Sequence, residues 1–152
     1  MNDEKIVQAV AQMLARVGIA SKVETAPMGP YSARASKQEF SFHMVGWGAS
    51  TGEASSPLRS LLATFNRDKG LGAVNWGRYS NVKVDYIIEQ ALQQVDDANR
   101  LFMLQEGTKL SMQELGIMPI HFQFTIWATK KNVAYTPRTD EYTLAFQFRP
   151  VK

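Results

Sequence analysis

The segment Gly48–Ala49–Ser50–Thr51–Gly52 matches the G-x-S-x-G pattern that surrounds a nucleophilic serine in one class of hydrolases. Asp96 or Asp97 and then His121 follow in the chain order that such enzymes use for their acid and base. A nucleophile elbow requires a helix that begins at the serine itself, whereas Pro57 predicts a helix start several residues later. No glycine-rich segment lies upstream to supply an oxyanion hole. A small serine hydrolase is therefore the alternative hypothesis and not the leading one.

Metal and thiol chemistry find little support in the composition. The chain has no cysteine, which excludes thiol catalysis, disulfides and thiolate metal sites. Its two histidines, His43 and His121, lie in separate apolar stretches, where a packed histidine is the commoner outcome. The acidic residues that lie near one another fall on expected helices, as caps and solvated faces. The sequence predicts neither a metal site nor a cofactor.

Aromatic and small polar residues stand together at two places in the chain. Trp47 ends the apolar stretch FSFHMVGW, and Gly48, Ala49 and Ser50 follow it directly. Small side chains leave backbone groups open to a ligand, and an indole offers a flat apolar face with one N–H donor. Asn75 and Trp76 begin a second cluster of this kind. These clusters favour ligand binding over catalysis.

Hydrophobic periodicity predicts the elements that must position these clusters. Asn2 or Asp3 is expected to cap the first helix and Gly18 to end it, while Ser55 or Ser56 and Asp96 are expected to cap later helices. Helices are expected at 3–16, 28–37, 57–65, 82–95 and 97–115, and strands at 19–25, 40–47, 117–129 and 142–148. This order predicts an α/β fold with a mixed sheet flanked by helices. An opening helix that leads into a strand is typical of a βαβ crossover, so the first strand is expected to precede residue 1.

Length and charge further limit the classes of protein to which the chain can belong. A chain of 152 residues with 45% hydrophobic residues suits one compact domain. The net charge of +3 arises from scattered basic residues without a run of Lys or Arg, so a nucleic-acid surface is not expected. No stretch approaches the roughly 20 apolar residues of a membrane span, and the polar, acidic start of the chain differs from a signal peptide.

Several stretches together resemble a known family. They are NDEKIVQAVAQMLARVGI, FSFHMVGWGASTGEASS, GRYSNVKVDYIIEQAL, DDANRLFMLQEGTKLSMQELGIMPIHFQF and WATKKNVAYTPRTDEYTLAFQF. They are similar to the C-terminal part of the periplasmic solute-binding proteins of ABC importers, in the peptide/nickel-type family that includes oligopeptide- and dipeptide-binding proteins. The resemblance implies a periplasmic-binding-protein-II-like lobe, with residues 1–116 as its α/β part and residues 117–152 as the returning terminal strands.

The resemblance also implies a binding site and partners. The loop that holds a peptide main chain in these relatives falls on Trp47, Gly48, Ala49 and Ser50, and the family aspartate that pairs with the terminal ammonium falls on Ser50. A hydroxyl cannot replace that carboxylate, so Glu53 is the expected source of the charge. A second ligand-facing position, often tyrosine, falls on Gln123. The implied partners are a small peptide or peptide-like solute and an ABC permease, and the fragment alone is expected to self-associate.

Overall fold

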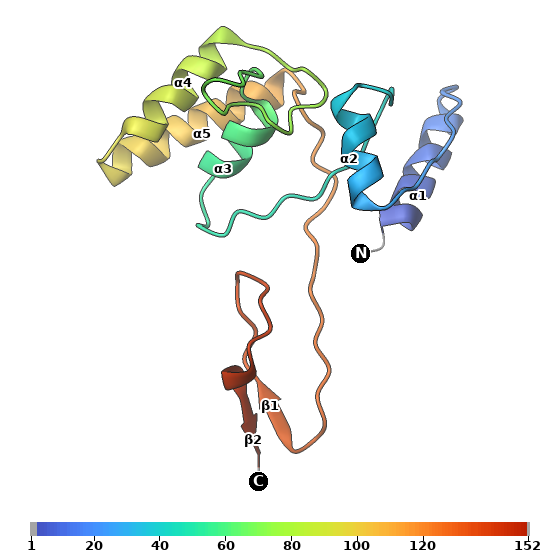
Figure 1. Cartoon of the computed structure of the whole chain (residues 1–152), viewed down its shortest axis with the longest axis vertical. Coiled ribbons are helices and arrows are strands. Elements are labelled where there is room, and N and C mark those ends of the chain that lie inside the picture. Colours follow the sequence, from blue (N-terminus) through green and yellow to red (C-terminus); the bar gives the residue numbers. More distant parts are fainter. Residues whose placement is uncertain (1–2, 152) are drawn as a thin grey trace.

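The computed structural model describes residues 3–151 and divides them into a helical region and a terminal hairpin. The elements in chain order are α1 (Asp3–Arg16), α2 (Met28–Ser36), α3 (Ser55–Pro57), the π-helical segment η1 (Leu58–Leu62), α4 (Val82–Gln93), α5 (Asp97–Gln113), β1 (Val133–Tyr135), the 3₁₀ segment η2 (Ala145–Gln147) and β2 (Phe148–Pro150). In Figure 1 the helices gather toward one end of the molecule, and a long extended segment leads from α5 to the β1–β2 hairpin.

The α4–α5 pair forms the centre of the packed region. A connection of three residues, 94–96, joins the two helices, and the side chain of Asp96 caps α5 by accepting a hydrogen bond from the N–H of Asn99 at 2.8 Å. Gly107 lies in α5 where a Cβ would stand 3.2 Å from Ile87 Cγ2, so glycine allows α4 and α5 to approach closely. The buried apolar side chains around this pair are Leu58, Leu61, Leu62, Ala63, Leu71, Val84, Ile88, Ala91 and Leu104. The helical unit that they stabilise spans residues 54–116.

The predicted range of the first helix is confirmed, since α1 ends before Gly18 as expected, but none of its residues is buried. Gly18 takes a positive φ of 85°, and the N–H groups of Gly18 and Ile19 donate to the carbonyls of Ala15 and Leu14. The expected cap at Asn2 lies outside the described residues. None of the helices in residues 3–151 combines the length and the apolar character that a membrane crossing needs.

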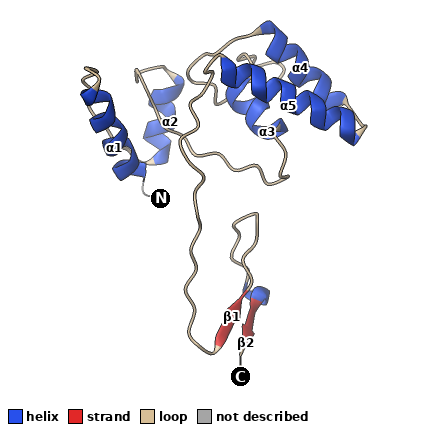
Figure 2. Ribbon diagram, turned by 180° about the vertical axis from the view of Figure 1, so that it is seen from behind, coloured by secondary structure: helices blue, strands red, loops and turns tan. Residues whose placement is uncertain are grey.

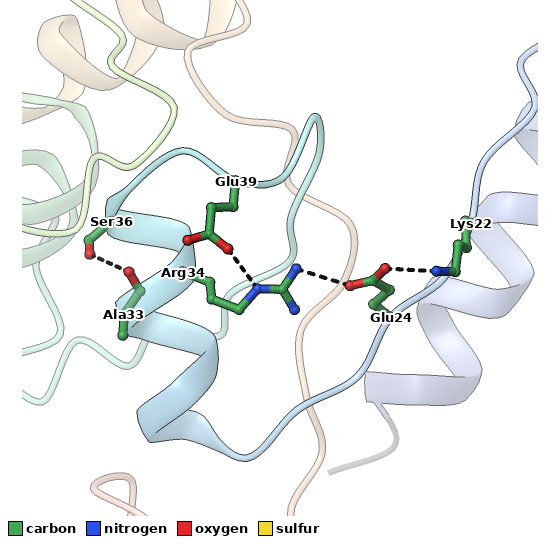
Figure 3. A network of polar contacts seen from close by, with 6 residues as sticks. All are labelled: Lys22, Glu24, Ala33, Arg34, Ser36 and Glu39. Atoms are coloured by element: carbon green, nitrogen blue, oxygen red, sulfur yellow. Dashed lines mark hydrogen bonds and ion pairs between the residues drawn. The ribbon is translucent and has the colours of Figure 1, made fainter.

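A surface network joins the chain after α1 to α2 (Figure 3). Arg34 of α2 donates to Glu39 at 2.9 Å and to Glu24 at 3.1 Å, and Lys22 donates to Glu24 at 3.1 Å. The Arg34 guanidinium also lies 4.4 Å from the centre of the Phe40 ring. Because these charges are solvent-exposed, the network orients the connection without adding much stability.

The strand predictions are largely wrong. Helices and strands both occur, but the only sheet within residues 3–151 has two antiparallel strands, with Val133 opposite Pro150 and Tyr135 opposite Phe148. Figure 2 shows these strands confined to the hairpin. The ranges 19–25, 40–47 and 117–129 contain no strand, and 142–148 becomes η2 with the first residue of β2. The mixed sheet is therefore absent from the described residues, because alternation specifies an extended backbone while a strand also needs a partner for its N–H and C=O groups.

One helix start also differs from its prediction. Helix α3 begins at Ser55, Ala54 takes the N-cap position, and no side chain caps it. The hydroxyl of Ser55 donates to Glu53, and the hydroxyl of Ser56 accepts from the Trp47 indole. Both hydroxyls are thus engaged with the preceding loop instead of the helix. The predicted helices at 82–95 and 97–115 are confirmed, and each ends two residues earlier than expected, at Gln93 and Gln113.

Candidate ligand-binding loop

The loop of residues 47–53, called the Trp47 loop below, presents an indole beside open backbone. The Trp47 side chain is 40% exposed, and its Nε1 donates to Ser56 Oγ at 3.2 Å. Gly48, Ala49 and Ser50 are all exposed, and space is open where a Cβ of Gly48 would stand. The N–H of Gly52 closes a turn on the carbonyl of Ala49 at 3.0 Å. This arrangement leaves backbone groups and part of the Trp47 indole accessible to a ligand.

Glu53 closes the loop with a charge that is already paired. Its carboxylate accepts hydrogen bonds from Arg100 Nε at 2.9 Å and Arg100 Nη2 at 2.5 Å, and also from Ser55 Oγ. The hydrogen bonds from Arg100, and then that from Ser55, lower the pKa of Glu53 to about 2. Glu53 is therefore ionised at neutral pH, but its charge faces Arg100. The carboxylate is not free to bind a ligand ammonium in this conformation, in contrast to the role expected for it.

Arg100 is a residue of this region that sequence reasoning missed. It lies in the first turns of α5, and its Nη1 donates to the carbonyl of Ala91 in the last turn of α4 at 2.6 Å. The orphan carbonyls at a helix C-terminus favour a cation, and that is the signal that could have singled Arg100 out. Its pairing with Glu53 had no local signal, because 47 residues separate the two positions.

Asn75 lies inside its loop and organises the backbone there. It is 3% exposed, and its Nδ2 donates to the carbonyls of Ala63 at 2.9 Å and Tyr79 at 2.7 Å. Its Oδ1 accepts from the N–H of Tyr79 at 3.0 Å. Both amide hydrogens are used and the group is buried, so in this structure the side chain bonds within its own loop, and its contact with a ligand stays a prediction. The Asn75 side chain thus holds the backbone of Tyr79 and Ala63 in position.

Trp76 packs against aromatic residues from an earlier part of the chain. Its ring centre lies 5.8 Å from that of Tyr31 in an edge contact and 5.7 Å from that of His43. Tyr31 donates its hydroxyl to the carbonyl of Met44 at 2.6 Å and stacks on Phe40. Burial lowers the pKa of His43, which favours its neutral form. Trp76 thus joins α2 and the segment after it to the helical unit, and among residues 3–151 no aromatic contact joins it to Trp47.

Gln123 is exposed in the extended stretch 117–132, called the arm below, which Figure 1 shows leading away from the helices. No hydrogen bond in the described part of the chain joins Gln123 to the Trp47 loop.

The residues of the hydrolase alternative lie apart from one another. His121 lies exposed in the same arm, and Asp96 is engaged as the cap of α5. Across residues 3–151, no hydrogen bond connects Ser50, Asp96 and His121, so the structure does not assemble the triad that the hydrolase alternative needs.

An open groove lies elsewhere, beside α4. Its polar groups are largely paired with one another: Asp85 accepts from the N–H and hydroxyl of Thr64, and Lys69 pairs with Glu89. The groove is lined by Thr64, Phe65, Asn66, Lys69, Leu71, Val82, Asp85, Tyr86 and Glu89. None of the candidate residues lines it. The side chains placed by the structure also include no group of three or more His, Asp or Glu that could hold a metal ion.

Comparison with known proteins gives one consistent similarity. No protein-family model matches the chain. Over 135 residues the chain is 32% identical to the glutathione-binding protein GsiB of Shigella dysenteriae serotype 1 (strain Sd197), and equally to those of Escherichia coli (strain K12) and Shigella flexneri. The aligned region covers 86% of this chain but 26% of each relative. The chain is therefore homologous to one part of these binding proteins and spans about a quarter of their length.

Proposed function

We propose that the chain belongs to the substrate-binding component of an ABC importer of the peptide/nickel type, which captures a small peptide or peptide-like solute in the periplasm and delivers it to a membrane permease. The similarity to glutathione-binding proteins over 86% of the chain is the observation that carries this proposal. Glutathione is a modified tripeptide, so a compound of that class is the expected solute. The protein binds its solute without transforming it.

The division of the chain follows from the same proposal. In the intact lobe, residues 1–116 belong to the α/β part and supply helices to it, and residues 117–152 supply its terminal strands. The arm supports this division, because from residue 118 to residue 126 every second side chain is large, apolar and exposed. These residues are Met118, Ile120, Phe122, Phe124 and Ile126. Such alternation is typical of a strand that packs one face against a core, which the rest of a longer protein would supply.

The Trp47 loop is the proposed solute contact. Trp47 packs against the solute, and Gly48, Ala49 and Ser50 bind it through backbone groups and one hydroxyl. Ser50 replaces a charge-assisted hydrogen bond by a neutral one, a difference of about 1 kcal/mol or more. Recognition of a free α-amino group is therefore weaker than in relatives with a carboxylate there. Gln123 adds a side-chain contact to the solute.

The proposal is tested by calorimetry on two proteins. The chain alone should bind glutathione, dipeptides and tripeptides no more tightly than millimolar, because the other lobe is missing. A chimera in which this chain replaces its aligned segment in GsiB of Escherichia coli (strain K12) should bind one of these solutes in the micromolar range. Trp47→Ala should weaken that binding at least about tenfold, since an aromatic contact with a ligand is lost.

Phe42→Ala is the matched control, because Phe42 is exposed and lies outside the proposed contacts. A folded chimera that binds none of the solutes would contradict the proposal. Micromolar binding by the isolated chain would contradict the account with two lobes. Labelling of Ser50 by a fluorophosphonate, or ester hydrolysis abolished by Ser50→Ala, would instead support the hydrolase alternative.

A further inference from the structure

Few hydrogen bonds join the Trp47 loop to the neighbouring helices. Residues 46–52 are exposed, and the turn bond from Gly52 to Ala49 holds the loop only to itself. The Trp47 indole reaches Ser56 at the start of α3. Glu53 alone in this loop extends a side chain to the α4–α5 pair, through Arg100. Val45 and Ala54 pack against the core on either side of the loop, and the Glu53–Arg100 ion pair is the side-chain link from the loop itself to the α4–α5 pair.

Arg100 makes contacts in two directions at once. Its Nε and Nη2 hold the Glu53 carboxylate side by side, and its Nη1 holds the carbonyl of Ala91 at 2.6 Å. A guanidinium is planar and its N–H groups are fixed relative to one another, so a contact on one side sets the geometry on the other. The end of α4 thus defines where Glu53 lies.

We propose that Arg100 is a positioning residue for solute binding: it fixes the Trp47 loop on the α4–α5 pair through Glu53 and so holds Trp47 and Gly48–Ser50 ready for the solute. This proposal rests on the proposed function and adds to it a residue that does not touch the solute. It also gives Glu53 a role other than pairing with a ligand ammonium. Pre-ordering of a binding loop strengthens binding because less freedom is lost when the ligand arrives.

Lysine cannot replace arginine in this arrangement. A lysine at position 100 keeps the positive charge, but its ammonium is a point charge on a flexible stem and cannot hold both the carboxylate and the Ala91 carbonyl in one plane. Arg67→Lys is the matched control, because Arg67 is exposed and its side chain takes part in none of the described hydrogen bonds. Glu53→Gln removes the charge while keeping the shape of the side chain.

The test measures hydrogen exchange in the full 152-residue chain and solute affinity in the chimera described above. In Arg100→Lys, the Gly52 amide, which donates to the Ala49 carbonyl within the loop, should exchange about tenfold faster, while exchange in α5 and the melting temperature stay close to those of Arg67→Lys. Solute affinity in the chimera should fall about tenfold, mainly through faster dissociation. Glu53→Gln should act in the same direction, and the double variant should be no weaker than the weaker single variant.

Three results would overturn the proposal: unchanged loop exchange in Arg100→Lys, an equal loss of protection throughout α5, or additive effects of the two substitutions. The outcome is separable from that of the proposed function. If loop exchange responds as expected but the unsubstituted chimera binds no solute, the loop is positioned by Arg100 and the solute-binding function is wrong.

Discussion

The helical unit of residues 54–116 and the arm of residues 117–132 contain similar apolar residue types in very different environments. Ile88 in α4 is 1% exposed, whereas Ile126 in the arm is 88% exposed. Figure 2 shows the arm as a single extended segment and the helical unit as helices lying against one another. Apolar character alone therefore does not decide burial. A side chain is buried when a partner surface stands opposite it at the right spacing.

The two regions differ in how far away their partners lie in sequence. Helix α5 follows α4 after three residues, so the two helices find each other locally, and α3 with η1 packs on the same pair. The arm has no helix packed along it, and its links to the following chain include side-chain hydrogen bonds from Thr125 to Glu141 and from Trp127 to Thr143. Among the described residues, no N–H of residues 117–132 donates to another backbone group. An extended segment needs a second segment to complete its hydrogen bonds, and that segment is generally distant in sequence.

The largest expected difference is in the free energy of unfolding, between alanine substitutions of the buried Ile88 and the exposed Ile126. Ile88→Ala removes a fully buried side chain and leaves a cavity, so it should lower the free energy of unfolding by about 2–5 kcal/mol. Ile126→Ala removes an exposed side chain and should change that free energy by no more than about 0.5 kcal/mol. Urea unfolding followed by helical circular dichroism measures both. Equal losses would break the comparison, because the arm would then contribute to the folded core.

A second, smaller effect tests the packing of the loop before α4. Gly72 has a φ of 62°, and a Cβ there would collide with the carbonyl oxygen of Ala63 and lie 2.7 Å from the Cα of Phe65. Gly72→Ala should therefore cost about 2–3 kcal/mol in the free energy of unfolding, through backbone strain and crowding. Gly77→Ala is the matched control in the same loop, since open space surrounds a Cβ at that position. A tolerated Gly72→Ala would show that this loop is loosely packed, like the arm.

The smallest effect concerns local hydrogen bonding at the start of α5. Asp96→Ala removes the acceptor for the N–H of Asn99 and should lower the free energy of unfolding by about 1 kcal/mol. Asp96→Asn should change it by only a few tenths of a kcal/mol, since asparagine caps a helix about as well. Thermal melts of the two variants measure the difference. Equal losses would mean that the charge of Asp96 matters more than its capping geometry.

The candidate site could be predicted in part. The residue types identify Trp47 with Gly48–Ser50 as an accessible loop, and the structure places them on the surface. The sequence did not indicate that Arg100 pairs with Glu53, since 47 residues separate them, nor that Asn75 is buried with its amide hydrogens used. Composition and spacing identify groups capable of binding. They do not show which of those groups are already engaged by another part of the chain.

Local interactions let the sequence alone determine the helices: α1, α2, α4 and α5 match their predicted ranges closely, Gly18 ends the first helix and Asp96 caps the last. These features depend on hydrogen bonds and side-chain spacing within a few residues. Only the tertiary structure decided that the extended segments after α2 and α5 join no sheet, and that Glu53 faces Arg100. Pairing within the expected mixed sheet and the Glu53–Arg100 ion pair require partners distant in the chain, whose positions follow from packing and not from the residues beside them.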